Sequence, residues 1–295
     1  MTLDGRLSGM RIAELYRGGR PIFSFEFFPP KTDAGYDSLY RTVLDLKRLD
    51  PDFISVTWGA GGSTRRKTVE IVTRIQRDIG ITAMAHLSCI GSTPDQLRAT
   101  LDELQRGGIE NILALGGDRP PDYAPPVGAF IYANELAAFI REARPEFCIG
   151  GACYPETHPL AASPEEDLTN LARKVADGAE FLISQLFFDN RDFFDFCERA
   201  RAVGIDVPIV PGIMPILSVA SIRRMTTLSG ARIPAELESK LSAVDGDDAR
   251  THAVGVDWAT TQCRELLEHG VPGIHFYTLN RSRATQQIFS NLQSA

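Results

Sequence analysis

Residues 82–115 read TAMAHLSCIGSTPDQLRATLDELQRGGIENILAL, and this stretch holds one complete unit of strand, helix and strand. Its ends, Thr82–Leu87 and Asn111–Leu115, are short apolar runs typical of strands covered on both faces. Between them, Thr93–Gln96 (TPDQ) predicts a helix start, because it combines a capping hydroxyl, a proline at the first helical position and a glutamine three residues after the cap. The leucines that follow recur on one helical face: Leu97, Leu101 and Leu104. This order of elements favours parallel strand pairing.

The same pattern recurs at a spacing of roughly 30 residues over much of the chain. Eight strand-like runs can be counted: Ile22–Phe28, Phe53–Trp58, Thr82–Leu87, Asn111–Leu115, Cys148–Tyr154, Phe181–Phe187, Pro208–Val210 and Gly273–Tyr277. The long interval before the last run carries three helix-like stretches: Val219–Leu228, Pro234–Leu241 and Thr251–Glu268. Because eight near-continuous apolar strands fit a closed barrel better than an open sheet, we predict an α/β fold, a (β/α)8 TIM barrel. It has an N-terminal extension and extra helices before the eighth strand.

Composition agrees with one large globular unit. Of the 295 residues, 43% are hydrophobic and 23% are charged, which supplies enough apolar material for a sizeable core. This excludes a disordered, collagen-like or disulfide-scaffold protein. A barrel of this kind uses about 250 residues or more, and no Gly/Ser/Pro-rich linker divides the chain. We therefore expect residues 1–295 to form a single domain.

The net charge and the lack of targeting signals limit the classes of partner and the location that we expect. With 31 Lys and Arg against 38 Asp and Glu, the net charge is −7, which disfavours nucleic acid and anionic membrane as partners. The chain shows neither a leader-like start nor a run of about 18 apolar residues, so we expect a cytoplasmic protein. Its histidines and cysteines lack the spacing of metal ligands, and no metal is expected.

Polar side chains stand at or just after the carboxyl ends of the predicted strands. In a parallel barrel these ends meet on one face, where barrel enzymes place their chemistry. Strand ends are also polar simply because they meet water, so the pattern alone leaves both interpretations open. The residues in question are Glu26, Thr57, His86, Asp118, Tyr154, His158, Gln185, Asn280 and Arg281.

Glu26 interrupts an otherwise apolar stretch, FSFEFFPP (Phe23–Pro30). A carboxylate among four phenylalanines costs roughly several kcal/mol of desolvation unless it is paired or protonated. Desolvation raises a carboxyl pKa, which suits a general acid working near neutral pH. Neutralisation of Glu26 by a buried arginine is the alternative. Asp118, flanked by glycines and by Arg119, lies in a more open polar loop, where we expect an ionised carboxylate.

The helix predicted after Ser163 carries one polar face. Ser163–Glu166 (SPEE) repeats the capping pattern of the first helix. At about 100° per residue, four polar side chains then fall within an arc of roughly 120°: Asp167, Asn170, Arg173 and Lys174. Asp and Asn bind ribose hydroxyls well, and Arg and Lys bind a pyrophosphate. A solvated charged face has the same pattern, and neither a Rossmann nor a P-loop motif occurs in the chain.

Taken together, nine motifs give the chain a specific resemblance from about Ile22 to Ser282. The sequence resembles the 5,10-methylenetetrahydrofolate reductases of the bacterial type, which consist of the catalytic barrel only. The motifs occur in the family's order: FSFEFFPPK (Phe23–Lys31), ISVTWGAGGS (Ile54–Ser63), AHLSC (Ala85–Cys89), ILALGGDRPP (Ile112–Pro121), YPETHP (Tyr154–Pro159), DLTNLARKVADGA (Asp167–Ala179), ISQLFFD (Ile183–Asp189), PGIMPI (Pro211–Ile216) and HFYTLNR (His275–Arg281). One such motif would mean little, whereas the ordered set is highly specific.

The resemblance implies a barrel that binds FAD and folate at its C-terminal face. It implies reduction of 5,10-methylenetetrahydrofolate to 5-methyltetrahydrofolate by NADH or NADPH, in alternating steps through the flavin, supplying methyl groups for methionine synthesis. It also implies a homo-oligomer. Two alternatives stay open: a related barrel that reduces the folate without tightly bound flavin, and a non-catalytic subunit that binds folate or a nucleotide.

By the same resemblance, Glu26 matches the family's proton donor and Asp118 the anion between flavin and pterin, which would stabilise a cationic intermediate. Gln185 matches a residue that contacts both alternating ligands, and Arg281 matches a folate contact. The matches to flavin or dinucleotide contacts are Thr57, His86, Leu115, Gly117, Asp118, Tyr132, Ala133, Tyr154, His158, Asp167, Asn170, Arg173 and Lys174.

The chain departs from the family pattern at Gly116, where the family commonly has an arginine that helps to hold the flavin diphosphate. Either Arg119, Arg173 or Lys174 supplies the missing charge, or FAD binds more weakly. In the helix after Pro215, some relatives carry a glutamine and an aromatic residue that touch substrate. This chain has Ser221 and Met225 there, so those contacts are not transferred.

Overall fold

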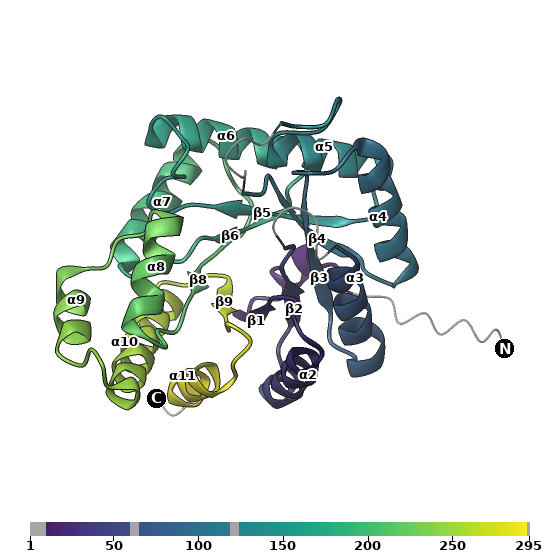
Figure 1. The fold of residues 1–295 in the computed structure, drawn as a ribbon. Coiled ribbons are helices and arrows are strands. Elements are labelled where there is room, and N and C mark those ends of the chain that lie inside the picture. Colours follow the sequence, from purple (N-terminus) through teal and green to yellow (C-terminus); the bar gives the residue numbers. More distant parts are fainter. Residues whose placement is uncertain (1–9, 60–64, 119–123, 294–295) are drawn as a thin grey trace.

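The computed structural model describes residues 10–59, 65–118 and 124–293. Within these ranges the strands form one parallel sheet that curves into a barrel, with helices around it (Figure 1). The sheet order is β7-β6-β5-β4-β3-β2-β1-β9-β8. The strands are β1 (Ile22–Phe27), β2 (Phe53–Val56), β3 (Ala83–Ser88), β4 (Asn111–Leu115), β5 (Cys148–Cys153), β6 (Phe181–Ser184), β7 (Ile209–Val210), β8 (Gly212–Ile213) and β9 (Gly273–Tyr277).

Two short strands, β7 and β8, share the seventh position of the barrel. Val210 of β7 pairs with Ile183 of β6, whereas Gly212 of β8 pairs with His275 of β9. Pro211 lies between the two strands, and a proline has no N–H for a strand ladder. The predicted (β/α)8 barrel is therefore confirmed, and the run predicted at 208–210 is the first half of its seventh strand.

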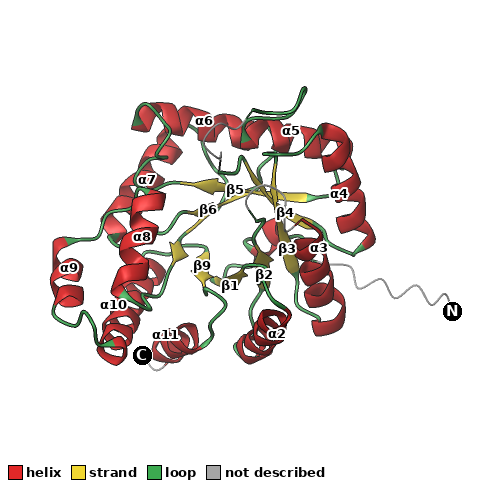
Figure 2. Ribbon diagram, in the orientation of Figure 1, coloured by secondary structure: helices red, strands yellow, loops and turns green. Residues whose placement is uncertain are grey.

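The helices lie outside the strands, as Figure 2 shows. They are α2 (Asp33–Lys47), α3 (Arg65–Arg74), the π-helical turn η2 (Ile75–Ile79), α4 (Pro94–Arg106), α5 (Ala133–Ala143), α6 (Pro164–Ala176), α7 (Asn190–Ala202), α8 (Val219–Ser229), α9 (Ala235–Ser242), α10 (Asp248–Glu268) and α11 (Arg283–Gln293). The capping predicted at Thr93 is confirmed, because its hydroxyl accepts from Gln96 N and the Gln96 side chain accepts from Thr93 N. The extra helices before the last strand are confirmed as α8, α9 and α10.

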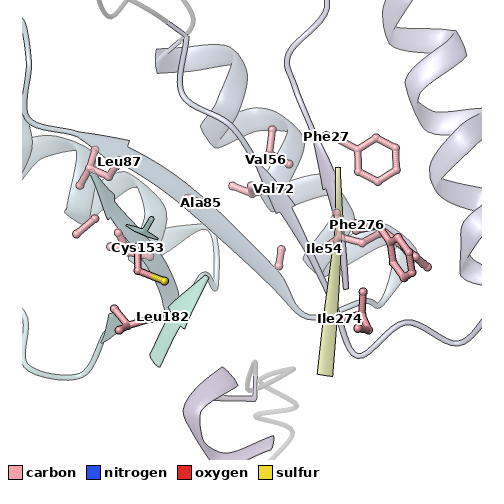
Figure 3. Close-up of a cluster of buried hydrophobic side chains, with 14 of the residues drawn as sticks. Phe27, Ile54, Val56, Val72, Ala85, Leu87, Cys153, Leu182, Ile274 and Phe276 are labelled. Carbon is pink, nitrogen blue, oxygen red and sulfur yellow. The ribbon is translucent and has the colours of Figure 1, made fainter. Parts of the chain in front are cut away.

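Strand alternation divides the side chains between two cores. Phe25 and Phe27 point outward into the core between sheet and helices, part of which Figure 3 shows. Ile22 belongs to the inner core, and Ser24 and Glu26 alternate in phase with it along β1. The apolar run around Glu26 therefore serves the outer core, while the carboxylate faces the barrel interior.

A short helix, α1 (Ile12–Leu15), covers the N-terminal end of the barrel. Ile12 is fully buried in the inner core, and its N–H donates to Asn111 Oδ1 at 2.9 Å. The Asn111 amide also donates to the Met10 carbonyl at 3.0 Å. This packing leaves the carboxyl ends of the strands as the face for a site. Among the described helices, none has the length and apolar character needed to cross a membrane.

Candidate active site

Glu26 contacts two imidazoles inside the upper part of the barrel. Its Oε2 atom lies 3.3 Å from Nε2 of His86 on β3 and 3.3 Å from Nε2 of His275 on β9. His275 is fully buried, and 16% of the Glu26 side chain remains exposed. On the other side of the His275 ring, Nδ1 lies 2.7 Å from Oγ of Ser24, its register partner on β1. The carboxylate is thus held at the barrel mouth by partners from two other strands, β3 and β9.

These partners correct the expected pKa of Glu26. Burial alone would raise the pKa, but the facing His86 and His275 imidazoles outweigh it and hold the pKa below its ordinary value. Burial is also the main reason that the pKa of His86 falls to about 4. The expectation of a raised pKa for Glu26 was wrong, because strand alternation turns Glu26 away from its phenylalanine neighbours and toward the two histidines. The buried-arginine alternative fails as well for the described part of the chain, where the ionisable groups that lower the pKa of Glu26 are histidines.

A second group of predicted residues meets at the end of β5. The rings of Tyr154 and His158 are in edge-on contact, with centroids 4.4 Å apart. The backbone N–H of His158 donates to Asp167 Oδ2 at 2.8 Å. Burial, followed by the charges of Asp118 and Asp167, raises the pKa of Tyr154 to about 12. Asp118 is exposed after β4 and acts electrostatically on both rings, so residues from two loops converge here.

Lys174 places a half-buried cation beside this group. Its Nζ donates to the Ala152 carbonyl at 2.6 Å, which uses one of three N–H donors. Burial lowers the pKa of Lys174, while Cys153 and Asp167 oppose that effect. The stem of the side chain passes close to Gly151, where a Cβ would lie 2.8 Å from Lys174 Cδ. On the exposed part of the same helix, Arg173 Nη1 donates to Asn170 Oδ1 at 3.1 Å.

The loop after β4 forms a close backbone approach beside α5. Gly117 has φ +91°, and a Cβ there would lie 2.0 Å from Ser88 Oγ, so the position requires glycine. A Cβ at Gly116 would lie 3.8 Å from the Ala133 amide nitrogen, which brings this loop beside the start of α5. Leu115 ends β4, and Tyr132 is 60% exposed before Ala133. The glycine backbone of this loop and the half-buried ammonium group of Lys174 fit a phosphate-bearing cofactor such as FAD.

The remaining predicted residues lie at the same end of the barrel. Thr57 follows β2, and its N–H donates to Phe27 O at 2.8 Å. Gln185 follows β6, where its Oε1 accepts from the neighbouring Leu186 N–H at 2.9 Å. Arg281 is exposed after β9. Within the described residues, no hydrogen bond joins Gln185 or Arg281 to Glu26, and Arg119 lies outside the described ranges.

Three residues of the site were not predicted: Ser24, His275 and Tyr277. The Tyr277 hydroxyl donates to Ser184 O at 2.6 Å, and burial together with the charge of Glu26 raises its pKa. His275 and Tyr277 alternate along the last strand, which neighbours the first strand in a closed barrel. This spacing of two polar side chains along an otherwise apolar strand was the signal in the sequence that could have identified His275 and Tyr277.

A closed (β/α)8 barrel with ionisable side chains at the carboxyl ends of its strands is the arrangement found in TIM-barrel enzymes. The family model described as Methylenetetrahydrofolate reductase matches residues 11–293, and the chain belongs to that family. This confirms the resemblance that the ordered motifs predicted.

Individual relatives agree with the family match. The chain is 38% identical over 274 residues to 5,10-methylenetetrahydrofolate reductase of Escherichia coli (strain K12), covering 93% of this chain and 91% of that protein. It is also 38% identical over 295 residues to Methylenetetrahydrofolate reductase (NADH) 1 of Arabidopsis thaliana, covering 96% of this chain. The chain spans 50% of that plant protein.

A solved structure shares the fold. It is an uncharacterized protein from Clostridium thermocellum that binds two copies of 5-methyl-5,6,7,8-tetrahydrofolic acid. The TM-score is 0.64 at 15% sequence identity, covering 97% of this chain and 98% of that one. At this identity, the comparison supports the barrel architecture alone.

Proposed function

We propose that this protein reduces 5,10-methylenetetrahydrofolate to 5-methyltetrahydrofolate with NADH or NADPH, using FAD. The main observation behind this proposal is the carboxylate of Glu26, which lies between two imidazoles at the barrel mouth. The chain that carries it belongs to this reductase family. When bound, FAD supplies hydride transfer between the nicotinamide and the folate. The reaction would provide methyl groups for methionine synthesis.

The proposed flavin contacts follow the shape and charge of the barrel mouth. Lys174 and Arg173 would bind the diphosphate, and Asp167 and Asn170 would accept hydrogen bonds from ribose hydroxyls. Gly117 would let the backbone approach the cofactor closely. The remaining proposed contacts are Thr57, His86, Leu115, Asp118, Tyr132, Ala133, Tyr154 and His158.

Glu26 would act as the proton donor to the folate. Because its pKa lies below the ordinary value without ligand, the carboxylate must take up a proton when the substrate binds. A bound pterin would cover the exposed 16% of the side chain and so favour the neutral acid. The proton would pass to the folate nitrogen whose bond to the one-carbon unit opens. Asp118 would then stabilise the cationic iminium, with Gln185 and Arg281 as further folate contacts.

One observation favours a second candidate, a reductase without tightly bound flavin. Gly116 stands where the family commonly carries a flavin-binding arginine, so the diphosphate loses one cation at this position. Lys174 lies half-buried beside the proposed diphosphate site and would compensate in part. The two candidates share the proton donor and differ in the hydride path.

An absorbance spectrum combined with a reductase assay tests both candidates. The purified chain is expected to show flavin bands in proportion to protein and to oxidise NADH or NADPH only when methylenetetrahydrofolate is present. Colourless protein that reduces the folate, with no increase in rate on adding FAD, would support the flavin-free candidate. Flavin-loaded protein that leaves the folate unchanged with either nicotinamide would overturn the proposed reaction.

A further inference from the structure

Glu156 lies between Tyr154 and His158 in the YPETHP motif, and the proposed reaction gives it no role. Its side chain is only 10% exposed although it is charged. The carboxylate accepts hydrogen bonds from the Arg232 backbone N–H at 3.0 and 3.1 Å and from Arg232 Nε at 2.8 Å. Two donors of one residue therefore hold the Glu156 carboxylate in a defined place.

Arg232 belongs to the connection between α8 and α9, far from Glu156 in the chain. Its Nη2 also donates to Asp192 Oδ1 on α7 at 2.7 Å. One guanidinium therefore joins the β5–α6 loop, the α8–α9 connection and helix α7, three segments that lie at one side of the barrel in Figure 1. The first two segments also meet at Gly230, where a Cβ would lie 3.1 Å from Pro159 Cγ.

Thr157, the residue after Glu156, has φ +82°. A β-branched residue in the left-handed region is strained and persists only where surrounding contacts impose the conformation. Those contacts lie on both sides of it. Arg232 holds Glu156 before it, and Asp167 accepts from the His158 N–H after it.

We propose that Glu156 and Arg232 are positioning residues for the flavin. Their ion pair holds Thr157 in its strained conformation and thereby orients Tyr154 and His158 toward the barrel mouth. The inference rests on the proposed function, because it needs FAD to bind beside these two rings. The α8–α9 connection therefore affects the affinity for FAD, although none of its residues is a proposed flavin contact.

The test compares FAD affinity of the apoprotein, measured by quenching of flavin fluorescence, in Glu156→Ala, Arg232→Ala and the wild type. Each variant is expected to raise the Kd for FAD about tenfold, the effect of losing hydrogen bonds to a charged group. Arg199→Ala is the matched control, because it breaks the Arg199–Asp195 ion pair on α7 without touching the loop. Its Kd is expected to equal that of the wild type.

Thr157→Gly separates positioning from general stability. Glycine adopts φ +82° without strain, so this change in the Glu156→Ala background is expected to recover part of the lost affinity. A merely structural ion pair would lower the melting temperature of Arg232→Ala and leave its Kd unchanged, and that result would overturn the inference. So would an equal loss of affinity in Arg199→Ala. Wild-type protein that does not bind FAD would overturn the flavin part of the proposed function together with this inference.

Discussion

Glu26 Oε2 and His275 Nε2 lie 3.3 Å apart, although the two residues are 249 positions apart in the chain. Ser24 Oγ, at 2.7 Å from Nδ1 of the same ring, is placed to donate its proton there. With Nδ1 as the acceptor, the ring N–H lies on Nε2 and donates to the carboxylate. Ser24 and His275 together thus favour the ionised form of Glu26 before the folate binds.

Glu26→Gln is expected to slow reduction of the folate by about a hundredfold to ten-thousandfold, the range associated with loss of a general acid. Glutamine keeps the shape of the side chain but has no acidic proton to give. Reduction of the flavin by NADH should stay close to the wild-type rate. Stopped-flow measurement of the two half-reactions separates them, and an equal loss in both would show that Glu26 is structural.

His275→Leu is expected to raise the pKa of Glu26, because burial is then opposed by fewer interactions. A rate that needs protonated Glu26 falls as pH rises through this pKa, so the fall should move to higher pH by about one unit. The pH profile of the folate half-reaction measures the shift. His275→Gln retains a donor and serves as the control with a near wild-type profile. Superimposable profiles for wild type and His275→Leu would contradict the assignment.

His86 makes the protein sensitive to acid. Its pKa is about 4 in the folded state and about 6.5 in an unfolded chain, so between these values the unfolded state binds the extra proton. The free energy of unfolding should therefore decrease as pH falls from 6.5 to 4, by on the order of 3 kcal/mol from this residue. The lowered pKa of Glu26 acts in the same direction at still lower pH. Urea unfolding at several pH values measures this, and His86→Gln should show a shallower dependence than the wild type. An equal pH dependence of the unfolding free energy in the two proteins would contradict this role of His86.

Lys174→Met should weaken FAD binding about tenfold or more, because methionine keeps much of the apolar stem and removes the cation. Titration of apoprotein with FAD gives the Kd directly. Lys240→Met is a suitable control, since Lys240 pairs with Glu236 on the exposed surface of α9. If both variants bind FAD as the wild type does, Lys174 does not hold the diphosphate.

Gly116→Arg should strengthen FAD binding by about tenfold, the contribution of one charge-assisted contact. The position has room for a side chain, because the nearest atoms to a Cβ there lie 3.8 Å away. Gly116→Ala tests the room without the charge and should leave the Kd unchanged. An arginine that does not improve affinity over alanine would mean that the cofactor diphosphate lies elsewhere.

Much of the fold could be predicted locally. The cap at Thr93, the proline at 94 and the near-continuous apolar runs specify helices and strands through neighbouring residues, and the structure confirms them. Eight strand positions then left a closed barrel as the best arrangement. The ordered motifs also predicted the family, which the comparisons confirm.

The environment of Glu26 could not be predicted in the same way. Its neighbours in sequence are phenylalanines, which suggested a raised pKa, whereas its neighbours in space are His86 and His275. Barrel closure brings β9 beside β1, and strand alternation decides which side chains face inward. Similarly, the ion pair of Glu156 with Arg232 depends on two loops that meet only in the folded chain.

The sequence by itself determined the element order, the barrel class, the reductase family and the predicted candidate residues, though not Ser24, His275 and Tyr277, because periodicity, caps and motifs are local properties. Only the tertiary structure decided which of those residues touch and in which protonation state they do so. The physical reason is that a pKa depends on burial and on charges a few ångströms away, and those neighbours come from strands distant in the chain.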